Sequence, residues 1–293
     1  MVAVLAALCA LSACSGVRVR VTMNRGVSFF KSKEYEKALE KFREATKIDP
    51  EYPDAWLDIG LTYMELYEPG STHEKDLEYA AGGIEAFREL LKLQPDNVKA
   101  KEYFINMCIQ SGQVPVAIEH FLADHQKNPG DLATVKTVAA LFQKAGQSEE
   151  AIEWFEKVAV LEPENPEAWY SLGVACWGRS YNNVDIDYDG RLALLDKGLT
   201  ALEKAQSLKT DYFEALTYSS LSYRQKAQYD ISPAQSVIWR QKADELLAKA
   251  MEIRNRQLAA QVAEANRQAK SAEGVAPGTA PAASSPTAKP PGH

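Results

Sequence analysis

The chain has 293 residues, a formal net charge of −7 and 46% apolar residues, so it can bury a sizeable core and is not disordered overall. The acidic balance argues against nucleic acid as the main partner, because binding phosphate requires a basic surface. Four scattered cysteines are too few for a disulfide framework, and no apolar stretch reaches the roughly 20 residues that cross a bilayer as a helix.

The chain opens with an apolar segment that ends at a cysteine. Residues 1–13 have the length of a signal-peptide core, and residues 11–14 read Leu-Ser-Ala-Cys. This tetrapeptide resembles the lipobox of bacterial lipoproteins, in which the cysteine is acylated and the chain is cut just before it. The resemblance implies a signal peptide over 1–13, a lipid on Cys14 and a tether over 14–18. It also implies a membrane-anchored lipoprotein of the bacterial cell envelope, at the outer membrane facing the periplasm, because Ser15 follows the cysteine. No Lys or Arg precedes the apolar run, and an ordinary secretory signal is the alternative.

Two short motifs recur through most of the remaining chain. The pattern W-x2-[L/I]-G begins at Trp56 and at Trp169, and the pattern A-x3-F begins at Ala38, Ala117 and Ala151. The two patterns resemble the first and second helices of a tetratricopeptide repeat (TPR). In that repeat the second helix ends before a proline, which cannot continue the helical hydrogen bonds.

The prolines confirm a period of 34 residues. Pro95, Pro129 and Pro163 are each separated by 34, and the same register extends in both directions with insertions between the helices of the second, fifth and sixth repeats. We place six repeats at 19–52, 53–97, 98–131, 132–165, 166–212 and 213–257. The resemblance implies an all-α fold, a right-handed TPR α-solenoid of about six helix-turn-helix repeats.

Small residues at the eighth position of a repeat are expected to let its two helices approach closely. These residues are Gly26, Gly60, Ala139 and Gly173. A helix pair cannot bury its apolar face alone, so neighbouring repeats are expected to stack. Cys108 and Cys176 stand at the eleventh position, where the repeat places a core aromatic residue, and are expected to be buried.

Three features interrupt or follow the regular repeats. Ser71 and Glu74 have the spacing of a capping box that would begin a lengthened second helix, and residues 231–233 break the sixth repeat before a helix. These insertions lie where repeat proteins often build a binding face, and the alternative is that they are tolerated loops. A capping helix is expected over 258–272, followed by a disordered tail rich in Ala and Pro over 273–293.

Motifs of catalysis are missing from the sequence. It contains no phosphate-binding glycine loop, no HExxH, no GxSxG and no CxxC. We therefore expect no enzyme activity, no cofactor and no small-molecule substrate.

One acidic segment, residues 185–196, resembles a twelve-residue calcium loop. The resemblance implies four carboxylate ligands: Asp185, Asp187, Asp189 and Asp196. A calcium-binding regulatory module is therefore the rival hypothesis. The alternative interpretation is an acidic connector in which Asp189 caps the following helix.

In TPR arrays the first helices of the repeats line a concave groove. The resemblance maps the groove onto Leu57, Leu61, Met64, Tyr103, Asn106, Ile109, Tyr170, Val174, Trp177, Leu221 and Arg224. Tyr170 and Trp177 are the expected anchors, because large rigid aromatic side chains carry much of the energy of interfaces. The alternative is that the chain's own tail helix fills the groove.

These observations lead to one functional hypothesis. The chain is expected to be a non-catalytic scaffold or adaptor of the bacterial envelope that binds an extended or helical segment of a protein partner in the groove, as an assembly factor for an envelope complex. Its layout resembles that of the TPR lipoproteins that act as pilotins and adaptors. Binding of chaperone C-terminal tails is not expected, because the positions of the carboxylate clamp hold Met23, Val27 and Asp58.

Overall fold

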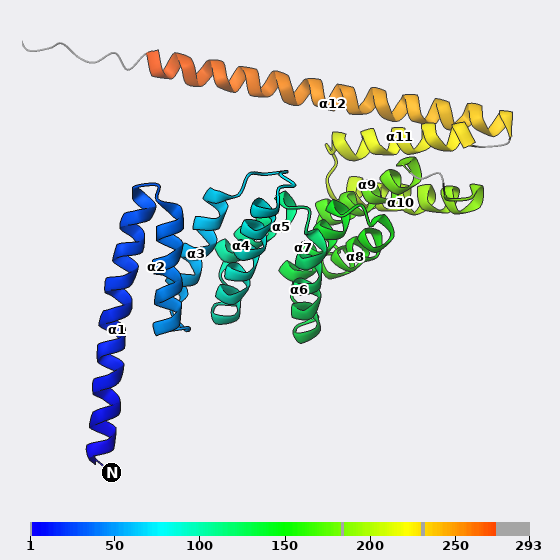
Figure 1. Ribbon diagram of the computed structural model, residues 1–293. Helices are drawn as coiled ribbons and strands as arrows, with labels where there is room; N and C mark the ends of the chain where they lie inside the picture. Colours follow the sequence, from blue (N-terminus) through cyan, green and yellow to red (C-terminus); the bar gives the residue numbers. More distant parts are fainter. Residues whose placement is uncertain (1, 183–184, 230–231, 274–293) are drawn as a thin grey trace, which may run out of the picture. The chain divides into compact units, whose positions relative to one another are not determined.

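The computed structural model describes residues 2–182, 185–229 and 232–273, which form twelve helices and no strand (Figure 1). The all-α fold expected from the repeat is therefore confirmed. The chain forms two compact units, residues 1–162 and 163–293. Within each unit consecutive helices pack on one another, as expected for helix pairs that cannot bury their apolar stripes alone.

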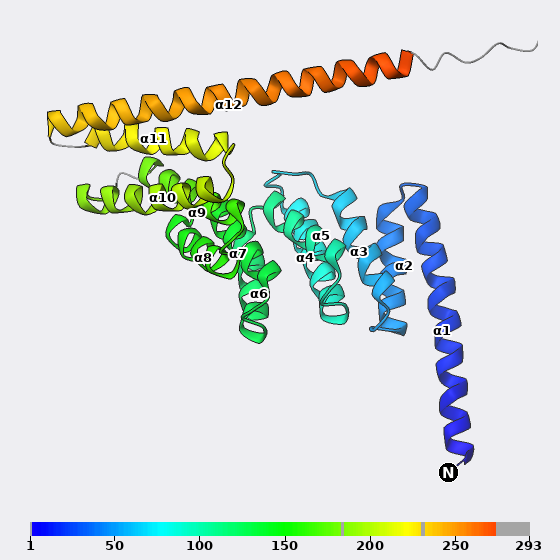
Figure 2. The same ribbon diagram turned by 180° about the vertical axis from the view of Figure 1, so that it is seen from behind.

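Unit 1 contains four helix pairs. They are α1 (Val2–Lys31) with α2 (Tyr35–Ile48), α3 (Pro53–Leu66) with α4 (Glu74–Leu93), α5 (Val98–Gln110) with α6 (Val114–Lys127), and α7 (Leu132–Lys144) with α8 (Ser148–Leu161). Within unit 1, each pair also contacts the pair that follows it in the chain, as both views show (Figure 1, Figure 2).

A glycine sets the separation of the two helices in the second pair. A Cβ atom on Gly60 would lie 2.4 Å from the buried ring of Phe87, so the ring occupies the space that any other side chain would need. This contact explains the small residue at the eighth position of the repeat. Cys108 and Cys176 are both buried, as the repeat register predicts.

The predicted capping box of the second repeat does not form. α4 begins at Glu74 with His73 as its N-cap, and no side chain caps it. The Ser71 hydroxyl instead donates to the Asp76 carboxylate at 2.5 Å and accepts from the His73 amide at 3.2 Å. The prediction is wrong because the helix starts two residues later than the spacing of Ser71 and Glu74 requires.

Unit 2 contains four helices of 17 to 41 residues. They are α9 (Pro166–Asn182), α10 (Tyr188–Leu208), α11 (Phe213–Tyr229) and α12 (Pro233–Glu273). One buried cluster comprises Leu202, Ala205, Tyr212 and Ala215, and a second comprises Leu216, Ala250 and Ile253. The first joins α10 to α11 and the second joins α11 to α12.

α12 is 41 residues long and includes the expected capping segment 258–272. It packs along α11 as far as Ile253, the last buried residue of the described chain (Figure 1). The side chains described beyond Gln257, as far as residue 268, are exposed. The expectations for residues 274–293 and for Ile231 lie outside the described residues.

α1 is a continuous helix from Val2, so the segments expected as a signal peptide and as a tether over 14–18 are helical here. Residues 2–31 contain no proline, so nothing in the sequence forces the helix to end before the first repeat. The side chain of Cys14 lies outside the described residues, and its lipidation stays a prediction. In the described part of the chain we find no helix that combines the length and the hydropathy needed to cross a bilayer.

Candidate functional site

The two residues expected as anchors lie together on unit 2. Tyr170 and Trp177, both from α9, contact Tyr218 of α11 edge to face, with ring centroids 5.8 and 5.2 Å apart respectively. Tyr181 stacks on Trp177 at 5.2 Å. We call Tyr170, Trp177, Tyr181 and Tyr218 the aromatic row.

The helical register of α9 creates this row. Positions 170, 174, 177 and 181 are spaced by three or four residues, so they share one face of the helix. Val174 is half-buried within the same stripe, as are Tyr170 and Trp177, whereas Tyr181 is 63% exposed. The row is therefore an aromatic surface that is ordered by ring contacts and open to solvent at one end.

Half of this row was not predicted from the sequence. Tyr218 is the sixth residue of its repeat and is not among the predicted groove residues, and Tyr181 belongs to the insertion of the fifth repeat. The available signal was the aromatic spacing of α9 itself, in which Tyr181 extends the stripe of Tyr170 and Trp177 by one turn.

Two phenols of this region, Tyr170 of the row and Tyr212 beside it, stay protonated at neutral pH. Burial raises the pKa of Tyr170 to about 12, with smaller contributions from Tyr218, Glu214 and Glu167. Burial, followed by a hydrogen bond to Glu167, also raises the pKa of Tyr212, whose ring lies 5.1 Å from that of Tyr170. The Tyr170 and Tyr212 phenols are therefore uncharged at neutral pH, although the carboxylates of Glu167 and Glu214 lie near them.

The tail helix does not cover this surface in the described residues. α12 packs on the opposite face of α11, where Leu216 is buried against Ala250 and the Ser220 hydroxyl donates to the Ala243 carbonyl at 2.7 Å. Tyr218 lies between those two positions in sequence and therefore on the other side of the helix.

The two remaining groove residues of unit 2 lie on α11 after Tyr218. Leu221 is half-buried. Arg224 donates to the Asp244 carboxylate of α12 at 2.9 Å. Arg224 therefore contributes to the contact between α11 and α12, a role that the predicted groove did not include.

The groove residues predicted in unit 1 lie on α3 and α5. Three half-buried residues follow one stripe of α3: Leu57, Leu61 and Met64. On α5, Tyr103 stacks on Phe87 with ring centroids 5.5 Å apart, and Asn106 is exposed. Ile109 lines a separate cleft of about 560 Å³ at the turn between α5 and α6.

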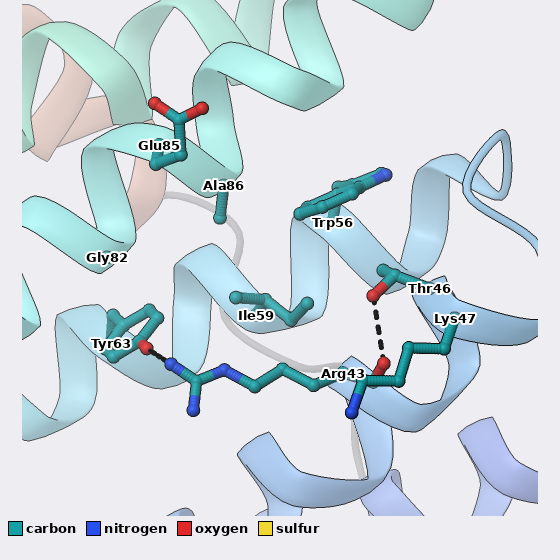
Figure 3. Close-up of a pocket in the computed structure, with 9 residues that line it drawn as sticks. All are labelled: Arg43, Thr46, Lys47, Trp56, Ile59, Tyr63, Gly82, Glu85 and Ala86. Atoms are coloured by element: carbon teal, nitrogen blue, oxygen red, sulfur yellow. Dashed lines mark hydrogen bonds between the residues drawn. The ribbon is translucent and has the colours of Figure 1, made fainter.

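A cleft of about 310 Å³ opens in unit 1 between α2 and α4, above α3 (Figure 3). It is lined by Arg43, Thr46, Lys47, Trp56, Ile59, Tyr63, Gly82, Glu85 and Ala86. Because an α-helix turns about 100° per residue, the α3 residues of this cleft point roughly 130° away from the stripe predicted to line the groove. The cleft thus lies on a different face of α3.

In the wall of this cleft, one cation and one glycine pack against the ring of Tyr63. The Arg43 guanidinium donates to the Tyr63 hydroxyl and lies 5.5 Å from the centre of its ring (Figure 3). A Cβ atom on Gly82 would lie 2.4 Å from the same ring. Trp56 donates through Nε1 to the Pro50 carbonyl at 2.8 Å. The repeat pattern does not specify Arg43 or Gly82, so it gave no signal for the cleft.

The acidic segment 185–196 begins a helix in the structure. Asp187 is the N-cap of α10, and its carboxylate accepts from the Gly190 amide at 2.8 Å. Asp189 lies in the first turn rather than at the cap, and Asp196 lies two turns further along the same helix. Among the residues that the structure describes, no group of three or more His, Cys, Asp or Glu side chains is placed to hold a metal ion.

Two buried cations stabilise the insertions of the fifth and sixth repeats. Arg191 is 7% exposed and lies 4.4 Å from the centre of the Tyr229 ring. Lys226 pairs with the Asp196 carboxylate and lies 4.6 Å from the centre of the Trp239 ring. Asp196 therefore neutralises a lysine of its own chain. The guanidinium of Arg191, which lies within the same segment 185–196, packs against the Tyr229 ring.

Comparison with known proteins supports the repeat assignment. The TPR repeat family model matches residues 26–66 and 140–178. The chain is 23% identical over 189 residues to the protein CTR9 homolog of Arabidopsis thaliana, covering 64% of this chain but 15% of that protein. It is 27% identical over 135 residues to the photosystem I assembly protein Ycf3 of Synechococcus sp. (strain CC9902), covering 41% of this chain and 76% of that protein.

A similar solved structure is YrrB, described as a TPR protein with an unusual peptide-binding site. It has 18% sequence identity and a TM-score of 0.39, covering 67% of this chain and 88% of YrrB. The family match falls on segments that the structure shows as paired helices of the expected register. These two segments, residues 26–66 and 140–178, therefore carry tetratricopeptide repeats.

Proposed function

We propose that this chain is a non-catalytic adaptor that binds an extended or helical segment of a partner protein on the aromatic row. The observation that carries the proposal is that Tyr170 and Trp177 meet across Tyr218, with the exposed ring of Tyr181 beside them. Tyr and Trp dominate the energy of many protein interfaces, because they bury a large area at a small cost in side-chain entropy. The repeats support a role as a protein-interaction scaffold.

The length of the row limits what it binds. From residue 170 to residue 181, α9 rises about 16 Å at 1.5 Å per residue. An extended chain covers that distance in about five residues. The expected ligand is therefore a short segment with two or three apolar or aromatic side chains, whose carbonyls accept from the tyrosine hydroxyls.

The proposal places the adaptor in the bacterial cell envelope. The support is the Leu-Ser-Ala-Cys sequence at residues 11–14, in which Cys14 would be acylated. Ser15, which follows it, would direct the protein to the outer membrane, facing the periplasm. Metabolic labelling with a fatty acid tests this part. Label is expected on the wild type and is expected to be absent from Cys14→Ser. Equal labelling of both proteins would contradict the anchor.

The proposal also includes a more specific role, the assembly of an envelope complex. One relative of this chain is named as an assembly protein of photosystem I, which supports an assembly role for this class of repeat.

The calcium-regulated alternative makes a separate prediction. If residues 185–196 bound calcium, the melting temperature would rise in millimolar calcium, because a ligand that binds only the folded state stabilises it. We expect no shift, because Asp187 is engaged as a helix cap and Asp196 pairs with Lys226.

Selection from a displayed peptide library tests the binding surface. Peptides enriched on the wild type are expected to share closely spaced apolar or aromatic residues. Their affinity for Trp177→Ala, measured by titration, is expected to be about 30-fold lower, which corresponds to the loss of about 2 kcal/mol typical of an interface anchor.

A matched tryptophan variant serves as the control. Trp56 lines the cleft of unit 1, so Trp56→Ala removes a tryptophan from the other candidate surface. It is expected to leave the peptide affinity unchanged. A loss of affinity in Trp56→Ala without a loss in Trp177→Ala would move the binding site to that cleft and overturn the proposal.

A further inference from the structure

The first helix has a charge opposite to that of the whole protein. The chain carries a net charge of −7, yet α1 contains no Asp or Glu. Arg18, Arg20, Arg25 and Lys31 all lie in its second half, and all four are exposed. This concentration of positive charge needs an explanation other than solubility, because the rest of the surface is acidic.

Two apolar side chains stand exposed among these arginines. Val17 is 62% exposed and Val21 is 46% exposed. The side of α1 that packs on α2 is different: Val19, Thr22 and Met23 are buried there. At about 100° per residue, Val17 and Val21 lie roughly 40° apart on the helix and opposite to that buried side.

The arginines flank the two valines. With the same helical rotation, Arg18 and Arg25 lie within about 100° of Val17 on one side, and Arg20 lies about 60° away on the other. An apolar strip bordered by arginines is the pattern of a helix that lies in the interface of a membrane, where apolar side chains enter the acyl boundary and guanidinium groups meet phosphates.

We propose that the exposed face of α1 formed by Val17, Arg18, Arg20, Val21 and Arg25 binds the surface of an anionic phospholipid membrane. The charge on this face is complementary to such a surface, and its two exposed valines gain burial there. Nucleic acid also attracts arginines, but it offers no apolar layer for the valines, so the lipid surface fits both observations. Figure 1 and Figure 2 show α1 at the edge of unit 1, with its first half extending beyond α2.

This inference extends the envelope location proposed above, but it does not require an acyl chain. The face lies three to eleven residues after Cys14, so an acylated protein would bring it to the lipid headgroups. The following test uses a protein that cannot be acylated at Cys14. Membrane binding by the face of α1 and acylation of Cys14 can therefore be refuted independently of each other.

The test is sedimentation of full-length Cys14→Ser protein with vesicles. One set of vesicles contains phosphatidylcholine alone, and the other contains phosphatidylcholine with phosphatidylglycerol. Residues 2–13 are present in every sample, so their contribution appears with both vesicle types. Stronger binding to the anionic vesicles, weakened by added salt, is expected.

Charge reversal identifies the face. Each arginine near an anionic surface contributes about fivefold in affinity, so Arg18→Glu, Arg20→Glu and Arg25→Glu together are expected to weaken binding to anionic vesicles by more than tenfold. The matched control reverses three exposed cations of α12, with Arg240→Glu, Lys242→Glu and Lys249→Glu. This control is expected to bind more strongly than the α1 variant, although its net charge is the same.

A second variant separates the membrane from other polyanions. Val17→Ser with Val21→Ser keeps every charge and is expected to weaken vesicle binding while leaving any binding of a single-stranded oligonucleotide unchanged. Equal binding to both vesicle types, or equal losses in the α1 and α12 charge variants, would overturn the proposal. So would an oligonucleotide affinity that exceeds the vesicle affinity. Circular dichroism of each variant checks that the helices are intact.

Discussion

The turn between α1 and α2 contains a lysine in a conformation that favours glycine. Lys33 has a φ of 61°, and it is the one non-glycine residue with positive φ in the described chain. Gly112 and Gly146 occupy the same fifteenth position of their repeats, with φ of 71° and 75°. The backbone hydrogen bonds also correspond: the amide after each of these residues donates to the carbonyl five residues before it, at 2.7 to 3.0 Å. Lys33→Gly is therefore expected to stabilise unit 1.

The expected gain in stability is the difference between two opposing contributions to the free energy of unfolding. A residue with a Cβ atom loses about 1–2 kcal/mol in the left-handed region. Glycine loses about 0.5–1 kcal/mol more backbone entropy than other residues when it is fixed in a fold. The net gain for Lys33→Gly is therefore about 0.5–1 kcal/mol, and the reverse change at an equivalent turn, Gly112→Lys, is expected to cost a similar amount.

Urea unfolding followed by circular dichroism measures both changes as shifts of the midpoint at constant slope. Lys33→Ala is the control, because alanine has the same Cβ penalty as lysine and is expected to leave stability nearly unchanged. If Lys33→Gly were neutral while Gly112→Lys was strongly destabilising, the argument from φ would be refuted, and the lysine side chain would have to contribute stabilising contacts of its own.

Three further substitutions or treatments test the packing. Gly60→Ala is expected to destabilise unit 1 by about 1–3 kcal/mol in the same urea assay, because the Phe87 ring lies 2.4 Å from the new Cβ position, and a wild-type midpoint would show that the ring moves freely. Burial, and then the nearby Asp54, raise the pKa of Asp58 to about 6 from an unfolded value of 3.8, so ionisation destabilises the fold as the pH rises through that interval. After allowance for its partial exposure, Asp58→Asn is expected to stabilise the protein by about 1 kcal/mol at neutral pH and not at all below pH ~4, whereas a gain of equal size at both pH values would exclude the ionisation argument. Burial raises the pKa of Cys108 to about 12, so its thiol is expected to resist alkylation until urea unfolds the chain, as mass spectrometry can follow.

The order of the helices could be predicted from the sequence because the repeat couples local and tertiary signals. Gly60 marks the close approach of two helices, and Pro163 follows the end of α8, so a single period reports both packing and helix ends. The same logic placed Tyr170 and Trp177 on one face of α9. These features depend on spacing along one helix, which the sequence displays directly.

The features that could not be predicted depend on where a helix starts or on which helix lies opposite. Ser71 has the spacing of a capping residue, but α4 starts two residues further on. Asp187 caps α10, whereas the alternative to the calcium loop assigned the cap to Asp189. Arg224 reaches Asp244 only because α12 lies beside α11. In the first two cases the residue type was informative but the start of the helix was not, and in the third the partner was set by a tertiary contact.

Hydrogen exchange of the wild-type protein with and without a selected peptide tests the central claim most directly. The account predicts slower exchange in α9 over residues 170–181 and in α11 over residues 213–221, with no change in α3, and it predicts that this protection is lost in Trp177→Ala. Protection confined to α2, α3 and α4, or protection that persists unchanged in Trp177→Ala, would contradict the assignment of the aromatic row as the partner-binding surface.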